Sequence, residues 1–387
     1  MQYPDSDHLL EEAIAAWQAG DSEAIEQTID LVRDWLSQAD TVRLPVTYHC
    51  AGGSNAPAVM ASVEGATFSL DDPVLLVPVH IDKPWGQEIW FTGIEARGES
   101  RVRTDNGTLG LASYLAAAPT RLCDRQPIVL LKILDPKPEP LLGELYFEVH
   151  AEKREVYVVT EVDERAWPEG AGRIRFGMNQ TRRAEFADDE SFRRAFLESI
   201  ERYEAIRQSI DSGETGLEAA ERDAREQTVA FTDYRALRTG DVVTVPAWVP
   251  HSLQHGVQVV EFQTPSYERH IISFAQQVTT QDHWDSATAI ARMHLDAPLE
   301  SDPESIAPGI EKIVNFPEFG VWRVALSPGK SLQLPGHIPY AVAICIRGTL
   351  SITGRSRSLE LQRHQAAFIP ASAISSVSTN HADETGL

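Results

Sequence analysis

The chain has 387 residues, of which 42% are hydrophobic and 24% are charged, and its formal net charge is −23 at pH 7. This length exceeds what one hydrophobic core normally holds, so two or three domains of ordinary globular composition are expected. The negative charge argues against nucleic acid and anionic membranes as partners, because both would repel the protein.

The cysteine count and the length of the apolar runs indicate the cellular compartment in which we expect the protein. Cys50, Cys123 and Cys345 are odd in number and far apart, which predicts neither a disulfide framework nor a cysteine metal site. The sequence contains no apolar run of about 20 residues, the length that crosses a membrane. Its N-terminal region is acidic, unlike a signal peptide. We therefore expect a cytoplasmic protein; the oligomeric state stays open.

The first part of the chain changes from helical to strand periodicity. Residues 7–40 predict two amphipathic helices, with a break and an N-cap at Gly20-Asp21-Ser22. Residues 43–176 then alternate between apolar and polar in short runs punctuated by Gly, Pro and Asp. This pattern is typical of a β-sandwich or a β-barrel.

The second part contains a helical insertion between two blocks of strands. Residues 191–211 and 216–227 are charged, with apolar residues at helical spacing, and strand patterning returns at 229–275. The segment Phe368-Ile369-Pro370-Ala371 parallels residues 243–247, which suggests two small barrels of related design. The predicted divisions are N-terminal helices at 1–42, a first barrel at 43–178 and 229–275, a helical insertion at 179–228, a connection at 276–312, and a C-terminal barrel at 313–387.

A candidate metal site lies in the strand pattern at residues 147–159. Glu148 and His150 are two residues apart, so on a strand both side chains lie on one face. A turn at residues 151–154 would return Glu155 beside them. Two carboxylates and an imidazole suit a dication such as zinc, whose nitrogen and oxygen ligands lie at roughly 2.0–2.2 Å. Short strands with outward Glu, His and Lys are also common as solvated faces.

The fourth ligand has to come from another part of the chain. His251, which follows Pro250, is the best candidate. His255 is its rival, but Gly256 places that histidine in a tight turn.

Several segments occur in a characteristic order along the chain. They are Lys83-Pro84-Trp85-Gly86 with Glu88-Ile89-Trp90, residues 127–135, Glu148-Val149-His150-Ala151, Lys153-Arg154-Glu155, residues 245–253, and Val260-Glu261-Phe262-Gln263 with Ser266-Tyr267-Glu268-Arg269. In this order they resemble the class I (type I) mannose-6-phosphate isomerase family. The resemblance covers roughly residues 75–275 and implies a mainly β, zinc-dependent bicupin with a helical insertion.

The resemblance also implies a reaction and a set of site residues. Such an enzyme interconverts mannose 6-phosphate and fructose 6-phosphate by moving a proton between C1 and C2 through an enediol(ate), with one zinc ion polarising the sugar oxygens. The implied metal ligands are Glu148, His150, Glu155 and His251.

The residues implied to act on the sugar lie around this ligand set. Arg269 would stabilise charge at the reacting centre, Lys153 would assist there, and Lys83 and Trp85 would line the mouth of the pocket. The sequence contains no clear basic cluster for the phosphate; Arg175, together with Arg173, Arg182 and Arg183, could supply it, and the alternative for these arginines is a solvated helix start. For Arg269 the alternative is a strand-end cation paired with Glu268 or Glu261, for Lys153 a solvated turn, and for Trp85 the core.

The chain departs from the family pattern at the metal site. Glu148 stands where the family has glutamine, and the link from His150 to Glu155 is short. A second carboxylate would hold a dication more strongly and reduce its Lewis acidity. A non-catalytic cupin that binds a metal or sugar for sensing or regulation is therefore the alternative function. A cupin dioxygenase fits less well, because such sites are usually rich in histidine.

Overall fold

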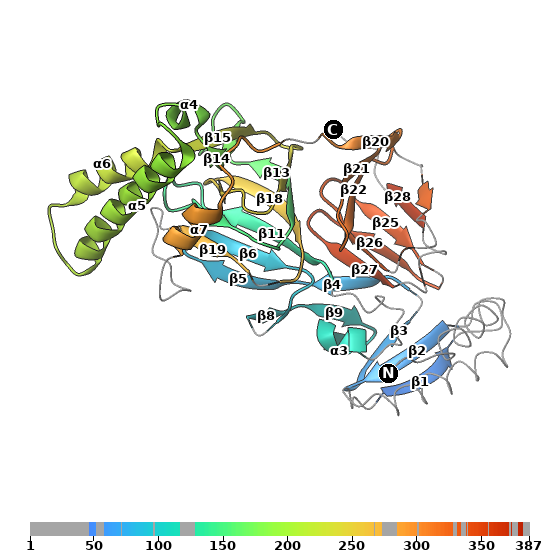
Figure 1. Ribbon diagram of the computed structural model, residues 1–387. Coiled ribbons are helices and arrows are strands. Elements are labelled where there is room, and N and C mark those ends of the chain that lie inside the picture. Colours follow the sequence, from blue (N-terminus) through green and yellow to red (C-terminus); the bar gives the residue numbers. More distant parts are fainter. Residues whose placement is uncertain are drawn as a thin grey trace, which may run out of the picture. The chain divides into compact units, whose positions relative to one another are not determined.

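The computed structural model describes residues 46–51, 58–70, 72–95, 97–116, 128–266, 268–272, 285–299, 302–327, 331–333, 338, 340–354, 356–370, 373 and 378–381 (Figure 1). Within these ranges the protein is mainly β, as the sequence predicts. The two helices predicted within residues 7–40 lie outside the described residues. None of the helices in the described ranges combines the length and hydropathy needed to cross a membrane.

The chain forms two compact units. Unit 1 comprises Met1–Val79, Trp90–Ile128 and Val324–Leu387, and unit 2 comprises His80–Ile89 and Val129–Arg323. Strands of residues 46–79 and 90–128, which the periodicity assigns to the first barrel, thus belong to the unit that contains the C-terminal strands. Backbone pairing explains this, because Val74 and Leu75 pair with Phe368 and Ala367.

Two antiparallel sheets build most of unit 2. The first runs in the order β16 (Val242–Val245), β13 (Glu155–Val162), β18 (Val257–Gln263), β11 (Leu130–Pro136), β6 (Gly86–Trp90) and β5 (Val79–Lys83). The second runs in the order β15 (Thr232–Leu237), β14 (Gly172–Met178), β17 (His251–Leu253), β12 (Phe147–Val149) and β19 (His270–Ile272). Neither sheet closes into a barrel among the described strands.

The core of unit 2 contains side chains from both sheets. On β13, Tyr157 and Val159 face this core together with Leu253 and Ile174 of the second sheet. The alternate residues Val156 and Val158 are equally buried but pack on the other side of the sheet. Their partners there include Ile313, Val314 and Val321, which belong to a small sheet of β20 (Glu304–Ala307), β21 (Ile310–Asn315) and β22 (Gly320–Val324).

Helices α5 (Asp189–Asp211) and α7 (Ser286–Arg292) cover the outer face of the second sheet. The short helix α4 (Gln180–Arg183) precedes α5, and α5 runs beside both α6 (Glu218–Val229) and α7 (Figure 1). The start of α5 is set by Asp188, whose carboxylate accepts a hydrogen bond from the Ser191 amide at 2.7 Å. Its apolar stripe of Phe192, Phe196 and Ile200 packs against Phe147 and Val149 of β12. Each such burial contributes about 1.5–3 kcal/mol.

Among its described residues, unit 1 contains smaller sheets and one short helix. One sheet contains β1 (Val46–Ala51), β2 (Ala58–Val63) and β3 (Ala66–Ser69). A second runs in the order β10 (Gly107–Gly110), β9 (Arg101–Thr104), β4 (Val74–Val77), β27 (Ala366–Pro370) and β24 (Tyr340–Ile344). A third runs in the order β23 (Ser331–Gln333), β28 (Ser378–His381), β25 (Leu350–Thr353) and β26 (Ser358–Leu361). The pair β7 (Ile94–Glu95) and β8 (Gly98–Glu99) and the helix α3 (Leu111–Ala116) complete the described elements.

Candidate metal centre

The predicted ligands Glu148, His150, Glu155 and His251 come together on the inner sides of the two sheets of unit 2. Glu148 is the middle residue of β12, between two side chains that pack outward, and it pairs directly with His251 on β17. His150 follows the end of β12. Glu155 is the first residue of β13 and lies on the same face as Tyr157 and Val159.

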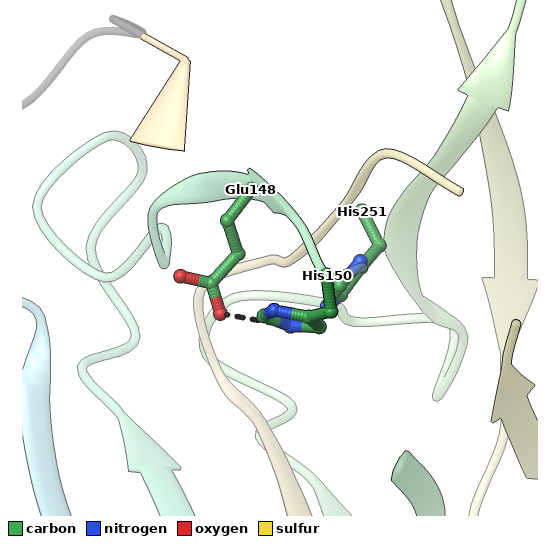
Figure 2. Close-up of side chains that lie close together, drawn as sticks. All are labelled: Glu148, His150 and His251. Carbon is green, nitrogen blue, oxygen red and sulfur yellow. Dashed lines mark ion pairs between the residues drawn. The ribbon is translucent and has the colours of Figure 1, made fainter. Parts of the chain in front are cut away.

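The ligand atoms are close together and almost entirely removed from solvent. His150, Glu155 and His251 are only 1%, 1% and 2% exposed. Ligand atoms of Glu148, His150 and His251 lie within 4.8 Å of one another, and their side chains point toward a common region (Figure 2). Glu155 joins them, because its Oε2 lies 3.4 Å from Nε2 of His150 and 3.3 Å from Nε2 of His251.

Backbone carbonyls determine which imidazole nitrogen can bind a metal. Nδ1 of His150 lies 3.1 Å from the carbonyl oxygen of Glu268, and Nδ1 of His251 lies 3.0 Å from that of Val249. A carbonyl oxygen can only accept, so each Nδ1 carries the hydrogen and each neutral ring has its lone pair on Nε2. Burial lowers the pKa of His150, with the Lys153 charge acting in the same direction, so this ring stays neutral at pH 7.

The Nε2 lone pairs of both histidines face carboxylate oxygens, which are also acceptors. A cation is the kind of ligand that fits between acceptors. Both Nε2 atoms are buried and have no hydrogen-bond partner among the described residues, and carboxylate oxygens lie opposite them. Four tetrahedral donors with bonds of about 2.0–2.1 Å to a metal are separated by roughly 3.3–3.4 Å. Three of the six donor separations, at 3.3, 3.4 and 3.5 Å, match that geometry. Glu148, His150 and His251 therefore fit a divalent metal together, and Glu155 lies within the same range of both imidazole nitrogens.

Both carboxylates are ionised. Burial acts to raise the pKa of Glu155, but the Lys153 cation outweighs it, helped by His150 at low pH where that ring is protonated, and holds the pKa well below the usual value. Burial likewise opposes the lowered pKa of Glu148, which results from His150 in its protonated form, Lys153 and Arg269. Nζ of Lys153 lies 2.5 Å from Oε1 of Glu155, and Nη1 of Arg269 lies 3.6 Å from Oε2 of Glu148. Arg269 thus offsets the charge of the Glu148 carboxylate.

Lys83 and Trp85, which the resemblance assigns to the mouth of the pocket, have other contacts in the structure. Lys83 lies in an ion pair with Glu88, at 3.3 Å, and Trp85 is part of the core between the sheets. Gly86, the first residue of β6, has φ +151° and passes so close to the Asp135 carbonyl that a Cβ would lie 2.2 Å from its oxygen. The Lys-Pro-Trp-Gly motif is therefore a tight turn that seats Trp85 in the core.

The arginines proposed for the phosphate do not join the metal-centre residues. Arg175 alternates with the inward-facing Ile174 and Phe176, and its side chain is 1% exposed, hydrogen-bonded to Thr232 and stacked on Tyr234. The remaining three also have partners of their own: Trp167 and Tyr234 for Arg173, Glu185 for Arg182, and Asp189 and Asp296 for Arg183.

A buried pair next to Glu155 was not predicted. Nζ of Lys132 on β11 lies 3.0 Å from Oε2 of Glu261 on β18 and 3.8 Å from Glu88 on β6. Burial acts to lower the pKa of Lys132, but Glu261 and Glu88 outweigh it and raise the pKa. Burial raises the pKa of Glu261 well above the usual value, with Lys132 opposing and Glu155 adding to the rise. The sequence does contain a signal for this pair. Lys132 and Glu261 are charged residues within apolar strands, at positions whose alternation faces inward.

Comparison with known proteins supports the fold. No protein-family model matches the sequence, and no curated protein matches it. Solved structures do match: the mannose 6-phosphate isomerase from Bacillus subtilis (16% identity, TM-score 0.57), a mutant phosphomannose isomerase from Salmonella typhimurium (14%, 0.61), and a zinc-bound mannose 6-phosphate isomerase (13%, 0.61). Each match covers 80% of this chain and 96% of the other. The chain has the fold of these isomerases, and at this identity the likeness extends to the fold alone.

Proposed function

We propose that this protein is a cytoplasmic, zinc-dependent bicupin that interconverts a phosphorylated aldose and ketose, with mannose 6-phosphate and fructose 6-phosphate as the substrate pair. The observation that carries the proposal is the convergence of two imidazole lone pairs and two ionised carboxylates in the interior of unit 2. The fold shared with zinc-bound mannose 6-phosphate isomerase supports the same assignment.

Glu148, His150, Glu155 and His251 would hold the metal. Zinc accepts this mixed set of nitrogen and oxygen ligands, and when bound it supplies Lewis acidity toward the sugar oxygens. The two carboxylates balance the charge of a dication. Lys153 and Arg269 then leave the surroundings positive, which suits an anionic, phosphorylated substrate.

Arg269 stabilises charge in this proposal. Its guanidinium lies beside Glu148 and stays protonated at any working pH. It can therefore donate hydrogen bonds to the sugar oxygens as they become negative, but it cannot take the proton from carbon. Lys153 reaches the same centre through Glu155 and would orient the substrate.

Glu261 is the carboxyl group best suited to hold the transferred proton. A general base works best when its pKa lies near the working pH, and burial moves the pKa of Glu261 upward from its usual acidic value. Lys132, 3.0 Å away, keeps the ionised form accessible. We propose this buried pair as a candidate for the proton-holding role.

One observation favours the alternative of a metal-binding cupin without turnover. Lys153 and Arg269 are each engaged by a ligand carboxylate, so both cations already have an anionic partner before a substrate arrives. A protein that only holds or senses a metal would need no more than this.

The deciding experiment combines metal analysis with an assay. We expect about one zinc per wild-type chain, little in His150→Ala and His251→Ala, and an unchanged amount in Arg269→Ala. Conversion of mannose 6-phosphate, coupled to detection of fructose 6-phosphate, should fall by about 10²–10³ in kcat for Arg269→Ala, because one charge-stabilising donor is lost. The matched control is Arg165→Ala, which removes an exposed arginine paired with Asp163.

Two results would contradict the proposal in different ways. Equal metal content in all variants would rule out the ligand set. A fully loaded wild type with no turnover on mannose 6-phosphate or related sugar phosphates would exclude the isomerase and leave the binding protein.

A further inference from the structure

The turn that joins His150 to Glu155 is held almost entirely by one side chain. The carboxylate of Glu268 accepts hydrogen bonds from three successive backbone amides: Ala151 at 2.6 Å to Oε1, and Glu152 and Lys153 at 2.8 and 3.1 Å to Oε2. The fourth amide of the turn, that of Arg154, donates to Oγ1 of Thr264 at 3.1 Å. Glu268 and Thr264 thus satisfy the backbone donors of residues 151–154.

Successive amides that point into one concavity form a site for an anion. In this protein the anion belongs to the chain itself, so the concavity is not available for a substrate phosphate. Hydrogen bonds between an ionised acceptor and N–H donors are about twice as strong as neutral ones. The turn between two metal ligands is therefore held by charge-assisted bonds.

The same residue orients the imidazole of His150. The Glu268 carbonyl oxygen lies 3.1 Å from Nδ1 of His150, and the carbonyl of His150 accepts a hydrogen bond from the Trp248 amide at 2.7 Å. Glu268 therefore contacts the ring of one ligand through its backbone and the turn leading to the next ligand through its side chain. Groups that orient metal ligands in this way usually change metal affinity when they are altered.

We propose that Glu268 is a positioning residue of the metal centre: by clamping residues 151–153 and the His150 ring, it sets the separation of His150 Nε2 from the Glu155 carboxylate. This inference rests on the metal centre of the proposed function. It adds a residue that does not itself touch the metal and that acts through the short turn of this chain.

The test compares Glu268→Gln and Glu268→Ala with Glu152→Gln. The control removes the same charge from an exposed neighbour within the clamped turn. Gln keeps one carbonyl oxygen but turns an amide donor toward the backbone donors, so we expect an intermediate effect. Zinc affinity, measured by competition with a chromogenic chelator, should fall about 10- to 100-fold in Glu268→Ala, less in Glu268→Gln and little in Glu152→Gln.

Two further measurements separate positioning from general destabilisation. The visible spectrum of the Co²⁺-substituted protein reports ligand geometry and should change in Glu268→Gln but not in Glu152→Gln. Hydrogen exchange in the metal-free proteins should speed up at residues 151–153 in both Glu268 variants, while the strands β13 and β18 keep their protection.

The outcomes distinguish this inference from the proposed function. Tight zinc binding that is equal in wild type, Glu268→Gln and Glu268→Ala, with unchanged exchange at the turn, would refute the role of Glu268 and leave the metal centre intact. Failure of the wild type to bind zinc at all would refute the metal centre and this role together. Zinc binding that depends on Glu268, in a protein without isomerase activity, would support the inference and refute the proposed reaction.

Discussion

Replacing Lys132 by methionine tests how the buried charges of Lys132, Glu261 and Glu88 affect the stability of the fold. Lys132→Met keeps the length of the side chain but removes the cation 3.0 Å from Glu261 and 3.8 Å from Glu88. Breaking a buried pair by removing one partner typically costs about 3–5 kcal/mol, because the other charge stays buried and uncompensated. Glu261 can escape that cost only by taking up a proton, so its pKa should rise further.

The pH dependence gives the size of the effect. A group whose pKa is higher in the folded than in the unfolded state stabilises the fold at low pH, and this stability is lost as pH rises through the folded pKa. The raised pKa of Glu261 already has this sign in the wild type. In Lys132→Met the loss should continue to higher pH, at about 1.4 kcal/mol per pH unit for one proton. The difference between the two proteins therefore grows as pH rises above the folded pKa of Glu261 in the wild type, by at most about 4 kcal/mol over three pH units.

The assay is chemical denaturation of the metal-free proteins at pH 5, 6.5 and 8, so that metal binding does not contribute. Because the chain has two compact units, the transition to follow is the one that shifts with the mutation. In the double variant Lys132→Met/Glu261→Gln the pH-dependent part should largely disappear. A difference between wild type and Lys132→Met that stays constant from pH 5 to pH 8 would refute this account of the pair.

Two further predictions concern the metal. Glu148→Gln removes one of the two ligand charges, so zinc affinity measured by chelator competition should fall about tenfold or more, since a unit charge beside a dication contributes more than the roughly 1.4 kcal/mol that tenfold requires. In the same variant kcat for mannose 6-phosphate should rise, because the metal becomes a stronger Lewis acid; an unchanged or lower kcat with full metal occupancy would contradict this. Acidification should release zinc, because the histidine ligands must be neutral. Since the pKa of His150 is lowered, release monitored by a zinc-sensitive dye should occur below the usual histidine pKa of about 6.5, and release above pH 7 would contradict the assigned protonation state.

Local sequence patterns predict the class of structure and half of the metal centre. The change from period-2 to helical spacing marks α5 and α6, because burial of one face imposes that spacing on any helix. The two-residue separation of Glu148 and His150 is an equally local signal, because side chains two residues apart on an extended chain lie on the same side. The short link to Glu155 likewise implies a tight return of the chain.

Tertiary structure alone decided the rest, because partners distant in sequence leave little trace in local patterns. The pairing of β4 with β27 places strands from both ends of the chain in one unit. Both faces of β13 are buried, so this strand reads as a nearly continuous apolar run, and periodicity cannot say which of its faces meets the metal centre. This is why the inner position of Glu155 appears only in the fold. On β14 the alternation of Arg173 and Arg175 with Ile174 and Phe176 does separate the two faces, but the burial of the Arg175 face appears only in the fold. The contacts of Lys132 with Glu261, and of Glu268 with residues 151–153, also depend on strand registers that join segments more than 100 residues apart.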